Sequence, residues 1–451
     1  MNVTIPSGPR HGTLTVPASK SWAHRILITA ALSAKNSRII CDGISKDITA
    51  TMDCLNALGA NITAELRDDG CTELLVTPIK ITVDHSDSTA LYAPLLCKES
   101  GSTLRFLIPV VGALGKDAVF HMDGRLSERP IDALTDVLKE HGMSFMQDGK
   151  YLYCRGKLTA GHFSIPGNIS SQYISGLLMA TPLLDSASDI EITGNIESGD
   201  YINMTAHAVR TAGVELTQNE NIYHIEPKGR FSVSGDLIVE KDWSSAAFPL
   251  CMGAFSKEGI TVTGLNTDSI QGDKEILNIL KGFGADISIT REQGFDAPEN
   301  AILQPDGMLY KPSADNGLCS ITVKRGSLKG QTIDASRIPD LVPVISVVAA
   351  GASGETRIIH AERLRIKESD RLFTAATMLK NLGADIEETE DGLIIKGKET
   401  LNGGTTEAFN DHRIAMSAAV AAGISENPVT VLGAECTDKS FPGFWDTLEA
   451  L

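Results

Sequence analysis

The sequence predicts an α/β protein of two domains, built from six repeats of a helix-strand-helix unit. Three observations lead to this prediction. A polar loop followed by a small, apolar helix recurs six times, and a β-rich run follows each copy. The 41 glycines and 5% aromatic residues suit a fold with many tight turns. At 451 residues, the chain also exceeds the size at which one hydrophobic core usually keeps growing.

The first helix of each repeat has a polar head, by which we mean the loop end and first helical turn, and an apolar body. The copies begin at Ser19, Ser100, Ser170, Trp243, Arg337 and Asp411. A helix that is apolar all round is buried against other helices. Its N-terminus carries unpaired N–H groups and the positive end of the helix dipole, so added Ser, Lys or Arg would make it an anion site. Six such heads facing one cleft would form an anion-binding cleft.

A strand and a second helix complete each repeat. Runs rich in β-branched residues cover 38–43, 118–124, 190–195, 260–265, 356–361 and 429–434. The second helices of the first five repeats end at Gly59, Gly142, Gly213, Gly284 and Gly383, where a left-handed residue is favoured. The sixth is the C-terminal segment 444–451. Further strand-like segments lie at 73–84, 151–156, 221–227 and 391–397. The division into three and three repeats falls between 229 and 242.

Composition excludes several classes of protein. The net charge of −17 argues against nucleic acid or an anionic membrane as a partner, although a local basic pocket could still bind a small anion. The eight cysteines are scattered singly, with no CxxC pair and no Cys/His spacing typical of a metal site. The N-terminus lacks the apolar segment of a signal peptide, and the run 341–352 is too short to cross a bilayer. We expect a cytoplasmic protein with reduced thiols and no metal.

Two of the early heads combine hydroxyls with basic side chains. Lys20 and Ser21 open the first apolar helix and Arg25 follows one turn later. The segment from Ser100 to Thr103, with Arg105, repeats this pattern, and Gly101 would let the backbone approach a ligand closely. Both patterns fit an anion site, and both also fit a serine helix cap with basic side chains that extend to solvent.

The next two segments bear on oxyanion binding. Arg125 and Arg129 lie just before a helix that Pro130 opens, and a planar guanidinium suits phosphate or carboxylate. Ser170, Ser171 and Gln172 supply uncharged donors for a polar substrate, although alone they fit a helix cap better.

The greatest density of charge lies in the segment HAERLRIKESDRL, residues 360–372. Such a run is usually a solvated helix face, but here it falls at the start of the second helix of the fifth repeat, which we expect to begin near Ser369. Asp340, which would otherwise cap a helix, and Glu368 bracket one strand of this repeat. Near Lys20 or Lys367 they would form an acid/base pair.

The last polar segments surround the sixth apolar helix. Arg413 follows its head at Asn410 to His412, and Lys439 lies further on. His412 has no partner at metal spacing. The chain also lacks a Walker A motif, a GxGxxG motif and a Ser-His-Asp arrangement, which removes the usual nucleotide-binding and acyl-transfer functions.

Nine segments, in order, resemble the 5-enolpyruvylshikimate-3-phosphate (EPSP) synthases. They are PASKSWAHR, SGSTLRF, DGRLSERPI, SSQYISGLLMATPLL, SIQGD, RIPDL, LRIKESDRL, NDHRIAM and CTDKSFP, from Pro17 to Pro442. The resemblance implies an inside-out α/β barrel of two domains, residues 1–18 with 239–451 and residues 19–238, with the active site in the cleft between them. It implies transfer of the enolpyruvyl group of phosphoenolpyruvate to the 5-hydroxyl of shikimate 3-phosphate through a tetrahedral intermediate, in the pathway to the aromatic amino acids. No cofactor is implied, and we expect a monomer.

The resemblance also implies roles for individual residues. The catalytic residues would be Lys20, Asp340 and Glu368, with Asp340 taking the hydroxyl proton and Glu368 protonating the methylene carbon. Shikimate 3-phosphate would be bound by Lys20, Ser21, Arg25, Ser170, Ser171, Gln172, Ser198, Tyr201, Asp340 and Lys367. Phosphoenolpyruvate would be bound by Lys20, Gly101, Arg125, Gln172, Arg371, Arg413 and Lys439.

Three positions depart from the family pattern: His24, Glu99 and Arg363, where asparagine is usual in all or some members. Two alternative functions are considered. UDP-N-acetylglucosamine enolpyruvyl transferases share the repeat fold but usually carry a reactive cysteine in the segment aligned with DGRLSERP, which has none here. A non-catalytic repeat protein that binds anions would need the basic residues but not Asp340 and Glu368 together.

Overall fold

The chain folds into two compact units in the computed structural model, which describes residues 1–80, 92–233, 235–292, 302–303, 309–310 and 318–451. Unit 1 comprises Met1–Ser19, Lys241–Asp296 and Ser313–Leu451, and unit 2 comprises Lys20–Glu240 and Ala297–Pro312. Our expected boundaries, after residues 18 and 238, lie one and two residues before the ends of the unit segments at Ser19 and Glu240. The assignment of Ala297–Pro312 to unit 2 differs from our expectation, which placed it in the first domain. Among the described residues, no helix is both long enough and apolar enough to cross a membrane.

Among the described residues, three sheets in each unit share one pattern. A central strand pairs in parallel with one neighbour and antiparallel with another, and a four-stranded sheet adds a further antiparallel strand. The central strands are those predicted to follow the apolar helices: β3 (Ser37–Cys41), β7 (Ala118–Met122), β11 (Ser188–Thr193), β15 (Ile260–Asn266), β21 (Glu355–Ile359) and β25 (Val429–Leu432). The predicted repeat of the sequence is therefore confirmed in all six copies.

The remaining strands fill fixed places around the central ones. Parallel neighbours that precede their own helix are β6 (Ala93–Lys98), β10 (His162–Pro166), β20 (Thr332–Asp334) and β24 (Gly404–Glu407). Antiparallel pairs are β4 (Asn61–Leu66) with β5 (Thr72–Thr77), β8 (Ser144–Asp148) with β9 (Tyr151–Arg155), β12 (Leu216–Asn219) with β13 (Ile222–Ile225), β16 (Asp286–Arg291) with β19 (Leu318–Lys324), and β22 (Asp385–Glu388) with β23 (Leu393–Lys396). Strands β17 (Ile302–Leu303) and β18 (Leu309–Tyr310) form a separate pair. Residues 81–84 of one predicted strand segment lie outside the described residues.

Near the two points where the chain passes between the units, after Ser19 and after Glu240, a strand pairs with a repeat other than the one whose helix it precedes. β2 (Gly12–Thr15) precedes the first helix of unit 2 but pairs in parallel with β15 of unit 1. β14 (Gly235–Ile238) precedes the first helix of unit 1 but pairs in parallel with β3 of unit 2. β1 (Asn2–Ile5) takes the antiparallel place beside β25. Unit 1 therefore completes two of its sheets with β1 and β2 from the N-terminal segment, whereas the repeat sheets of unit 2 lie within Lys20–Glu240.

Six apolar helices form the cores of the two units. They are α1 (Lys20–Ala31), α3 (Gly101–Ala113) and α5 (Ser171–Ala180) in unit 2, and α7 (Trp243–Gly253), α9 (Val342–Gly351) and α11 (His412–Ala421) in unit 1. In unit 1 the three helices pack on one another, and nearly all of their residues are buried. Burial of these apolar faces is the main favourable contribution to folding.

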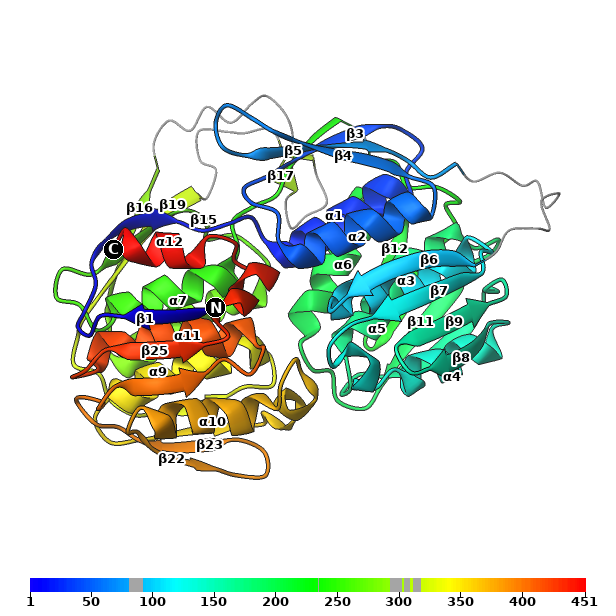
Figure 1. Cartoon of the computed structure of the whole chain (residues 1–451). Coiled ribbons are helices and arrows are strands. Elements are labelled where there is room, and N and C mark those ends of the chain that lie inside the picture. The colour runs from blue at the N-terminus through cyan, green and yellow to red at the C-terminus, as the bar shows by residue number, and fades with distance from the viewer. Residues whose placement is uncertain (81–91, 234, 293–301, 304–308, 311–317) are drawn as a thin grey trace. The chain divides into compact units, whose positions relative to one another are not determined.

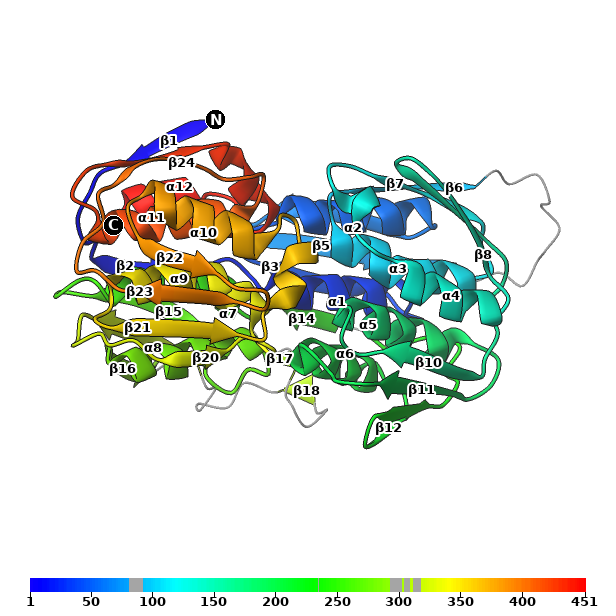
Figure 2. The same ribbon diagram turned by 90° about the horizontal axis from the view of Figure 1, so that it is seen from below.

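The second helices cover these cores. They are α2 (Lys46–Ala57), α4 (Asp132–Glu140), α6 (Gly199–Thr211), α8 (Ile276–Phe283), α10 (Arg371–Asn381) and α12 (Phe444–Glu449). In Figures 1 and 2, α10 lies beside α9 and α11 near the edge formed by β22 and β23, and α6 lies beside α1 and α5. The five predicted glycines all have positive φ, which confirms the left-handed residue expected at these helix ends. Gly284 is itself the C-cap of α8, and the other four glycines directly follow the C-cap residue.

Gly284 provides a test of this capping. It ends α8 at φ +98°, and an added Cβ would lie 2.6 Å from the backbone oxygen of Ser327. Gly354 in the same unit has φ +87° and open space around it. Gly354→Ala should therefore destabilise the protein by about 1–2 kcal/mol from the left-handed backbone alone, and Gly284→Ala should destabilise it more. Urea unfolding of both variants measures the difference, and equal losses would show that the Ser327 contact is unimportant.

Candidate active site

In four of the six apolar helices, the residues that are not fully buried lie at the polar head. In α3, α5 and α7 every residue is buried except the second, which is Ser102, Gln172 and Ser244 respectively. In α1 only Lys20 and Ser21, the first two residues, are partly exposed. An apolar helix whose only open residues are polar and lie in its first turn can present N–H groups and hydroxyls to a ligand. The candidate site is therefore built from these heads, within each unit separately.

Arg371 is the centre of the polar network of unit 1. It is the first residue of α10 and is only 1% exposed. Its Nη1 donates to Asp340 Oδ1 at 2.8 Å, its Nη2 to Glu368 Oε2 at 2.7 Å, and its Nε to Asp411 Oδ2 at 2.8 Å. These carboxylates stand before or at the starts of α9, α10 and α11. The guanidinium therefore brings both predicted acids, Asp340 and Glu368, into one cluster.

Helix capping determines where α10 begins. Asp370 adopts an extended backbone, and its carboxylate accepts a hydrogen bond from the N–H of Phe373 at 3.1 Å. The helix therefore begins at Arg371, two residues after the predicted start. Lys367 and Glu368 remain in the preceding loop, between the 3-10 helix η5 (Glu362–Ile366) and α10, as the sequence predicts.

Arg413 and Lys367 also act on Asp340, which lies in the 3-10 helix η4 (Pro339–Leu341). Arg413 Nη2 donates to Asp340 Oδ2 at 3.0 Å, and the Lys367 Nζ lies 3.7 Å from Oδ1. Burial alone would raise the pKa of Asp340, but Arg413, Lys367 and Arg371 outweigh it and hold the pKa well below its usual value. Burial lowers the pKa of Lys367 to about 8, although Asp340 acts in the opposite direction. Asp340 is thus a stabilised carboxylate beside a lysine that can release its proton.

A further acid, Asp273, is connected to Arg413 through Ser244. Asp273, in the 3-10 helix η3 (Gly272–Glu275), is 3% exposed and accepts a hydrogen bond from the Ser244 hydroxyl. The same Ser244 Oγ accepts from Arg413 Nη2 at 2.9 Å. Burial, followed by the negative charge of Asp340, raises the pKa of Asp273 to about 6. Asp273 and Ser244 were not named as site residues, although Asp273 ends the segment SIQGD and Ser244 lies in the predicted polar head that begins at Trp243.

Arg25 is the corresponding centre of unit 2. It is 2% exposed and donates to Ser21 O at 2.7 Å, Thr205 Oγ1 at 2.7 Å and Tyr201 O at 2.8 Å. Its guanidinium also lies over the ring of Phe106, 5.1 Å from the ring centre. Burial lowers the pKa of Arg25 to about 10. Arg25 therefore joins the heads of α1 and α6, and so brings predicted residues Ser21 and Tyr201 to one place.

Lys20 has a nearby acid that the sequence did not single out. Its Nζ lies 3.0 Å from Asp47 Oδ2, in the first turn of α2, and both side chains are more than four-fifths buried. A partly buried ion pair of this kind orients the ammonium group of Lys20.

The heads of α3 and α5 are joined by Gln172. Its Nε2 donates to Ser102 Oγ at 3.0 Å, and its Oε1 accepts from Arg105 Nη1 at 3.2 Å. Arg105 lies against Gly101, where an added Cβ would be 2.6 Å from Arg105 Nη1 and 2.9 Å from Arg129 Nη1. A side chain at position 101 would therefore displace both guanidinium groups.

The two arginines around the segment LSE differ in environment. Arg125 is half exposed, with its Nε 3.4 Å from Glu128 Oε2. Arg129 instead lies at Gly101. Both positions fit the predicted oxyanion role, but only Arg129 is in contact with the head of α3.

The other predicted residues lie at helix starts. Ser170 caps α5 through a hydrogen bond from Gln172 N, and Ser171 is buried beside it. Ser198 precedes α6 in a left-handed conformation, with φ +51°, which is uncommon for a residue other than glycine. Lys439 Nζ donates to the carbonyl of Asn410, directly before the α11 cap, at 2.9 Å.

The three departures from the family pattern lie in different surroundings. His24 is buried in α1, with its Nδ1 2.8 Å from Thr51 Oγ1. Burial, then Lys20 and Arg25, holds the pKa of His24 well below its usual value, so the ring is neutral. The Glu99 carboxyl group lies against Gly124, next to Arg125. Arg363 is 8% exposed within η5.

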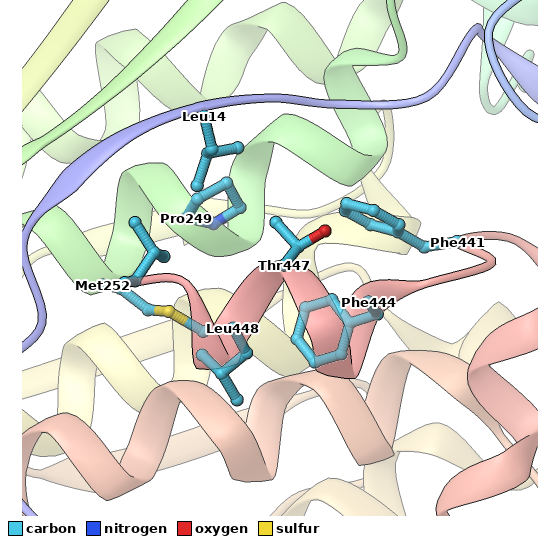
Figure 3. A pocket seen from close by; sticks show the side chains of 8 residues that line it. Leu14, Pro249, Met252, Phe441, Phe444, Thr447 and Leu448 are labelled. Atoms are coloured by element: carbon cyan, nitrogen blue, oxygen red, sulfur yellow. The ribbon is translucent and has the colours of Figure 1, made fainter. Parts of the chain in front are cut away.

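An apolar pocket in unit 1 is unrelated to these polar groups (Figure 3). Side chains of β2, α7 and the C-terminal region around α12 line it: Leu14, Pro249, Met252, Phe441, Phe444, Thr447, Leu448 and Leu451. None of the predicted site residues lines this pocket. It is a packing feature of the C-terminal helix rather than a part of the candidate active site.

Comparisons with known proteins agree on one family. A family model for EPSP synthase (3-phosphoshikimate 1-carboxyvinyltransferase) matches residues 5–448. A curated 3-phosphoshikimate 1-carboxyvinyltransferase from Clostridium acetobutylicum is 41% identical over 448 residues, covering 98% of this chain and 95% of the relative. Another from Brachyspira hyodysenteriae is 40% identical over 456 residues, covering 100% and 99%.

Solved structures share the fold. An EPSP synthase from Acinetobacter baumannii superimposes with a TM-score of 0.77 at 24% identity, covering 100% of this chain and 97% of that one. The enolpyruvyl transferase NikO from Streptomyces tendae superimposes with a TM-score of 0.74 at 15% identity, covering 100% and 97%. At these identities, the likeness concerns the fold alone.

The contribution of Asp411 to the Arg371 cluster can be tested against a matched cap. Asp411 and Asp370 both cap a helix, but only Asp411 also pairs with Arg371, and it is fully buried. Asp370→Ala should destabilise the protein by about 1 kcal/mol through loss of a cap. Asp411→Ala should destabilise it by about 3–5 kcal/mol, because it leaves a buried guanidinium with one carboxylate fewer.

Denaturant unfolding of the two variants measures this difference. Similar losses for Asp370→Ala and Asp411→Ala would show that Asp340 and Glu368 suffice to hold Arg371.

Proposed function

The chain belongs to the EPSP synthase (3-phosphoshikimate 1-carboxyvinyltransferase) family, and we propose that it transfers the enolpyruvyl group of phosphoenolpyruvate to the 5-hydroxyl of shikimate 3-phosphate. The products are 5-enolpyruvylshikimate 3-phosphate and phosphate, on the route to the aromatic amino acids. The observation that carries this proposal is the Arg371 cluster, in which three acids (Asp340, Glu368 and Asp411) lie among three basic groups (Arg371, Arg413 and Lys367) in the part of the chain that the family match covers.

We assign the proton transfers of the reaction to the two acids Asp340 and Glu368. In the addition step, Asp340 receives the 5-hydroxyl proton as the oxygen bonds to C2 of phosphoenolpyruvate, and Glu368 gives a proton to the methylene carbon C3. In the elimination step, Glu368 takes a proton back from C3 and the C2–O bond to the phosphate breaks, which releases phosphate. Asp340 then gives the hydroxyl proton to solvent, so both acids return to their starting states. Both acids contact Arg371 in this structure, at 2.8 Å and 2.7 Å, which supports their assignment to one reaction centre.

The arginines connect substrate binding to the basicity of Asp340. A carboxylate held by Arg371, Arg413 and Lys367 is a weak base, because its pKa is well below the usual value. An anionic substrate that binds the arginines would weaken their hold on Asp340 and raise its pKa. Asp340 would therefore become a better base only when phosphoenolpyruvate is bound.

The remaining predicted residues are proposed to bind the substrates. For shikimate 3-phosphate, the donors of Ser170, Ser171, Gln172, Ser198 and Tyr201 join Lys20, Ser21, Arg25 and Lys367. For phosphoenolpyruvate, Gly101, Arg125, Lys439 and Gln172 join Lys20, Arg371 and Arg413. The contacts of Arg129 with the head of α3 favour adding it to this second set. We also propose a cytoplasmic monomer; eight free thiols support the compartment.

The sister activity on UDP-N-acetylglucosamine is not favoured. The turn from Asp123 to Ile131 carries no cysteine, and seven of the eight cysteines are buried. A non-catalytic anion-binding protein would not require Asp340 and Glu368 to meet at one guanidinium.

The proposed function predicts acceptor-dependent phosphate release. Purified protein should release phosphate from phosphoenolpyruvate when shikimate 3-phosphate is present, and a colorimetric phosphate assay measures this. Neither phosphoenolpyruvate alone nor phosphoenolpyruvate with UDP-N-acetylglucosamine should give release. Release that depends on the nucleotide sugar, or none with shikimate 3-phosphate, contradicts the proposal.

The proposed role of Glu368 predicts a selective loss of turnover. Glu368→Gln should lower kcat by roughly 100-fold or more, since proton transfer acts in the transition state. The Kd for shikimate 3-phosphate should stay within about threefold, because glutamine keeps an acceptor oxygen for Arg371. Glu362→Gln, at an exposed position in the same segment, is the control and should behave as wild type. Equal losses of binding and turnover would make Glu368 a structural residue.

A further inference from the structure

We propose that Asp273 takes up a proton when an oxyanion binds at Arg413, so that this buried acid makes anion binding by unit 1 depend on pH. The inference deepens the proposed function, because it rests on Arg413 as an anion ligand. The first observation is that Ser244 contacts both Asp273 and Arg413. Ser244 Oγ donates to Asp273 and accepts from Arg413 Nη2 at 2.9 Å, so one hydroxyl separates the acid from the guanidinium.

Arg413 contacts Asp340 directly and Asp273 through the hydroxyl of Ser244. Its Nη2 donates to Ser244 Oγ and to Asp340 Oδ2, at 2.9 Å and 3.0 Å, and its Nη1 donates to the Asp340 carbonyl at 3.0 Å. The Arg413 side chain is 6% exposed. An arriving oxyanion would therefore place its charge on a guanidinium that already compensates buried carboxylates.

The charged groups around Asp273 make it the acid that takes up a proton when an anion binds at Arg413. The charged groups that act on it are Asp340 of η4, Arg413 of α11 and Asp242 at the start of α7. Lys274, its neighbour in η3, donates to the carbonyls of Thr267 and Ser269, both at 2.8 Å. The following helix, α8, carries Lys281 in its last turn.

The direction of the effect follows from these charges. The pKa of Asp273 is already raised to about 6 by burial and by Asp340, whereas Asp340 stays ionised because three cations face it. A further negative charge near Arg413 would raise the pKa of Asp273 again, by a shift on the order of one unit. Proton uptake and anion binding then reinforce one another, because linkage between two ligands is reciprocal.

The sign of the pH dependence is fixed by this linkage. Below about pH 6 Asp273 is neutral before the anion arrives, so binding is tightest. As the pH rises through about 6 to about 7, the acid ionises in the free protein and the anion must recruit a proton. Affinity should therefore fall by up to about tenfold for a shift of one unit.

Sulfate is a suitable probe, because it stays dianionic across this range while phosphate and phosphoenolpyruvate change charge. Calorimetric titration of the full chain with sulfate near pH 6.5, in two buffers of different ionisation enthalpy, measures the protons taken up. Wild type should take up roughly half a proton per sulfate. Asp273→Asn should remove this uptake and should bind sulfate up to about tenfold more tightly than wild type near pH 7.5. A merely structural role would not tighten binding.

Two further variants keep the test sharp. Asp385→Asn neutralises an exposed acid of the same unit and should leave both proton uptake and affinity as in wild type. Ser244→Ala removes the hydrogen bond that stabilises the Asp273 carboxylate, so the midpoint of the pH dependence should move to higher pH. Circular dichroism and urea unfolding verify that each variant is folded.

The outcomes separate this inference from the proposed function. Equal proton uptake and equal affinity in wild type and Asp273→Asn overturn the inference, whether or not shikimate 3-phosphate drives phosphate release. A loss of uptake with tighter binding in Asp273→Asn supports it, even if the phosphate-release assay fails and the proposed function is wrong.

Discussion

The buried guanidinium of Arg371 is the interaction on which the active arrangement of unit 1 depends. A charge that is 1% exposed must be paired, because an unpaired buried ion is strongly destabilising. Here the partners come from three separate helix starts, at Asp340, Glu368 and Asp411. The starts of α9, α10 and α11 are thus held in register by one side chain. The proposed proton acceptor Asp340 and the proposed proton donor Glu368 are brought together by the same contacts that stabilise the fold.

The repeat explains why polar groups collect at these positions. In α1, α3, α5 and α7 the body of the helix is buried, and polar residues of the first turn are the part that stays partly exposed. Arg25 does for unit 2 what Arg371 does for unit 1, since both are buried arginines that join several helix starts. β2 and β14 take the parallel place beside β15 and β3, so the first sheet of each unit has the same strand arrangement as the other repeats.

The electrostatics of unit 1 favour a site that responds to its ligand. Asp340 is held ionised by three cations, the pKa of Lys367 is lowered to about 8, and that of Asp273 is raised to about 6. Groups with displaced pKa values in one buried cluster are typical of sites that move protons. Burial is the first cause of the displaced pKa values of Lys367 and Asp273, whereas Arg413, Lys367 and Arg371 hold that of Asp340 low. In the proposed function, an anionic substrate at the arginines couples binding to proton transfer.

The sequence alone determined the architecture: the six apolar helices, the strand after each, and the five glycine caps follow from local periodicity, β-branched residues and backbone constraints. It also placed Lys367 and Glu368 in a loop at a helix start. Tertiary structure decided which of the polar residues meet. Arg129 rather than Arg125 contacts Gly101, and Asp47, Ser244 and Asp273 became partners of Lys20 and Arg413. Burial and ion pairing are set by residues tens to hundreds of positions apart, so local patterns could not specify them.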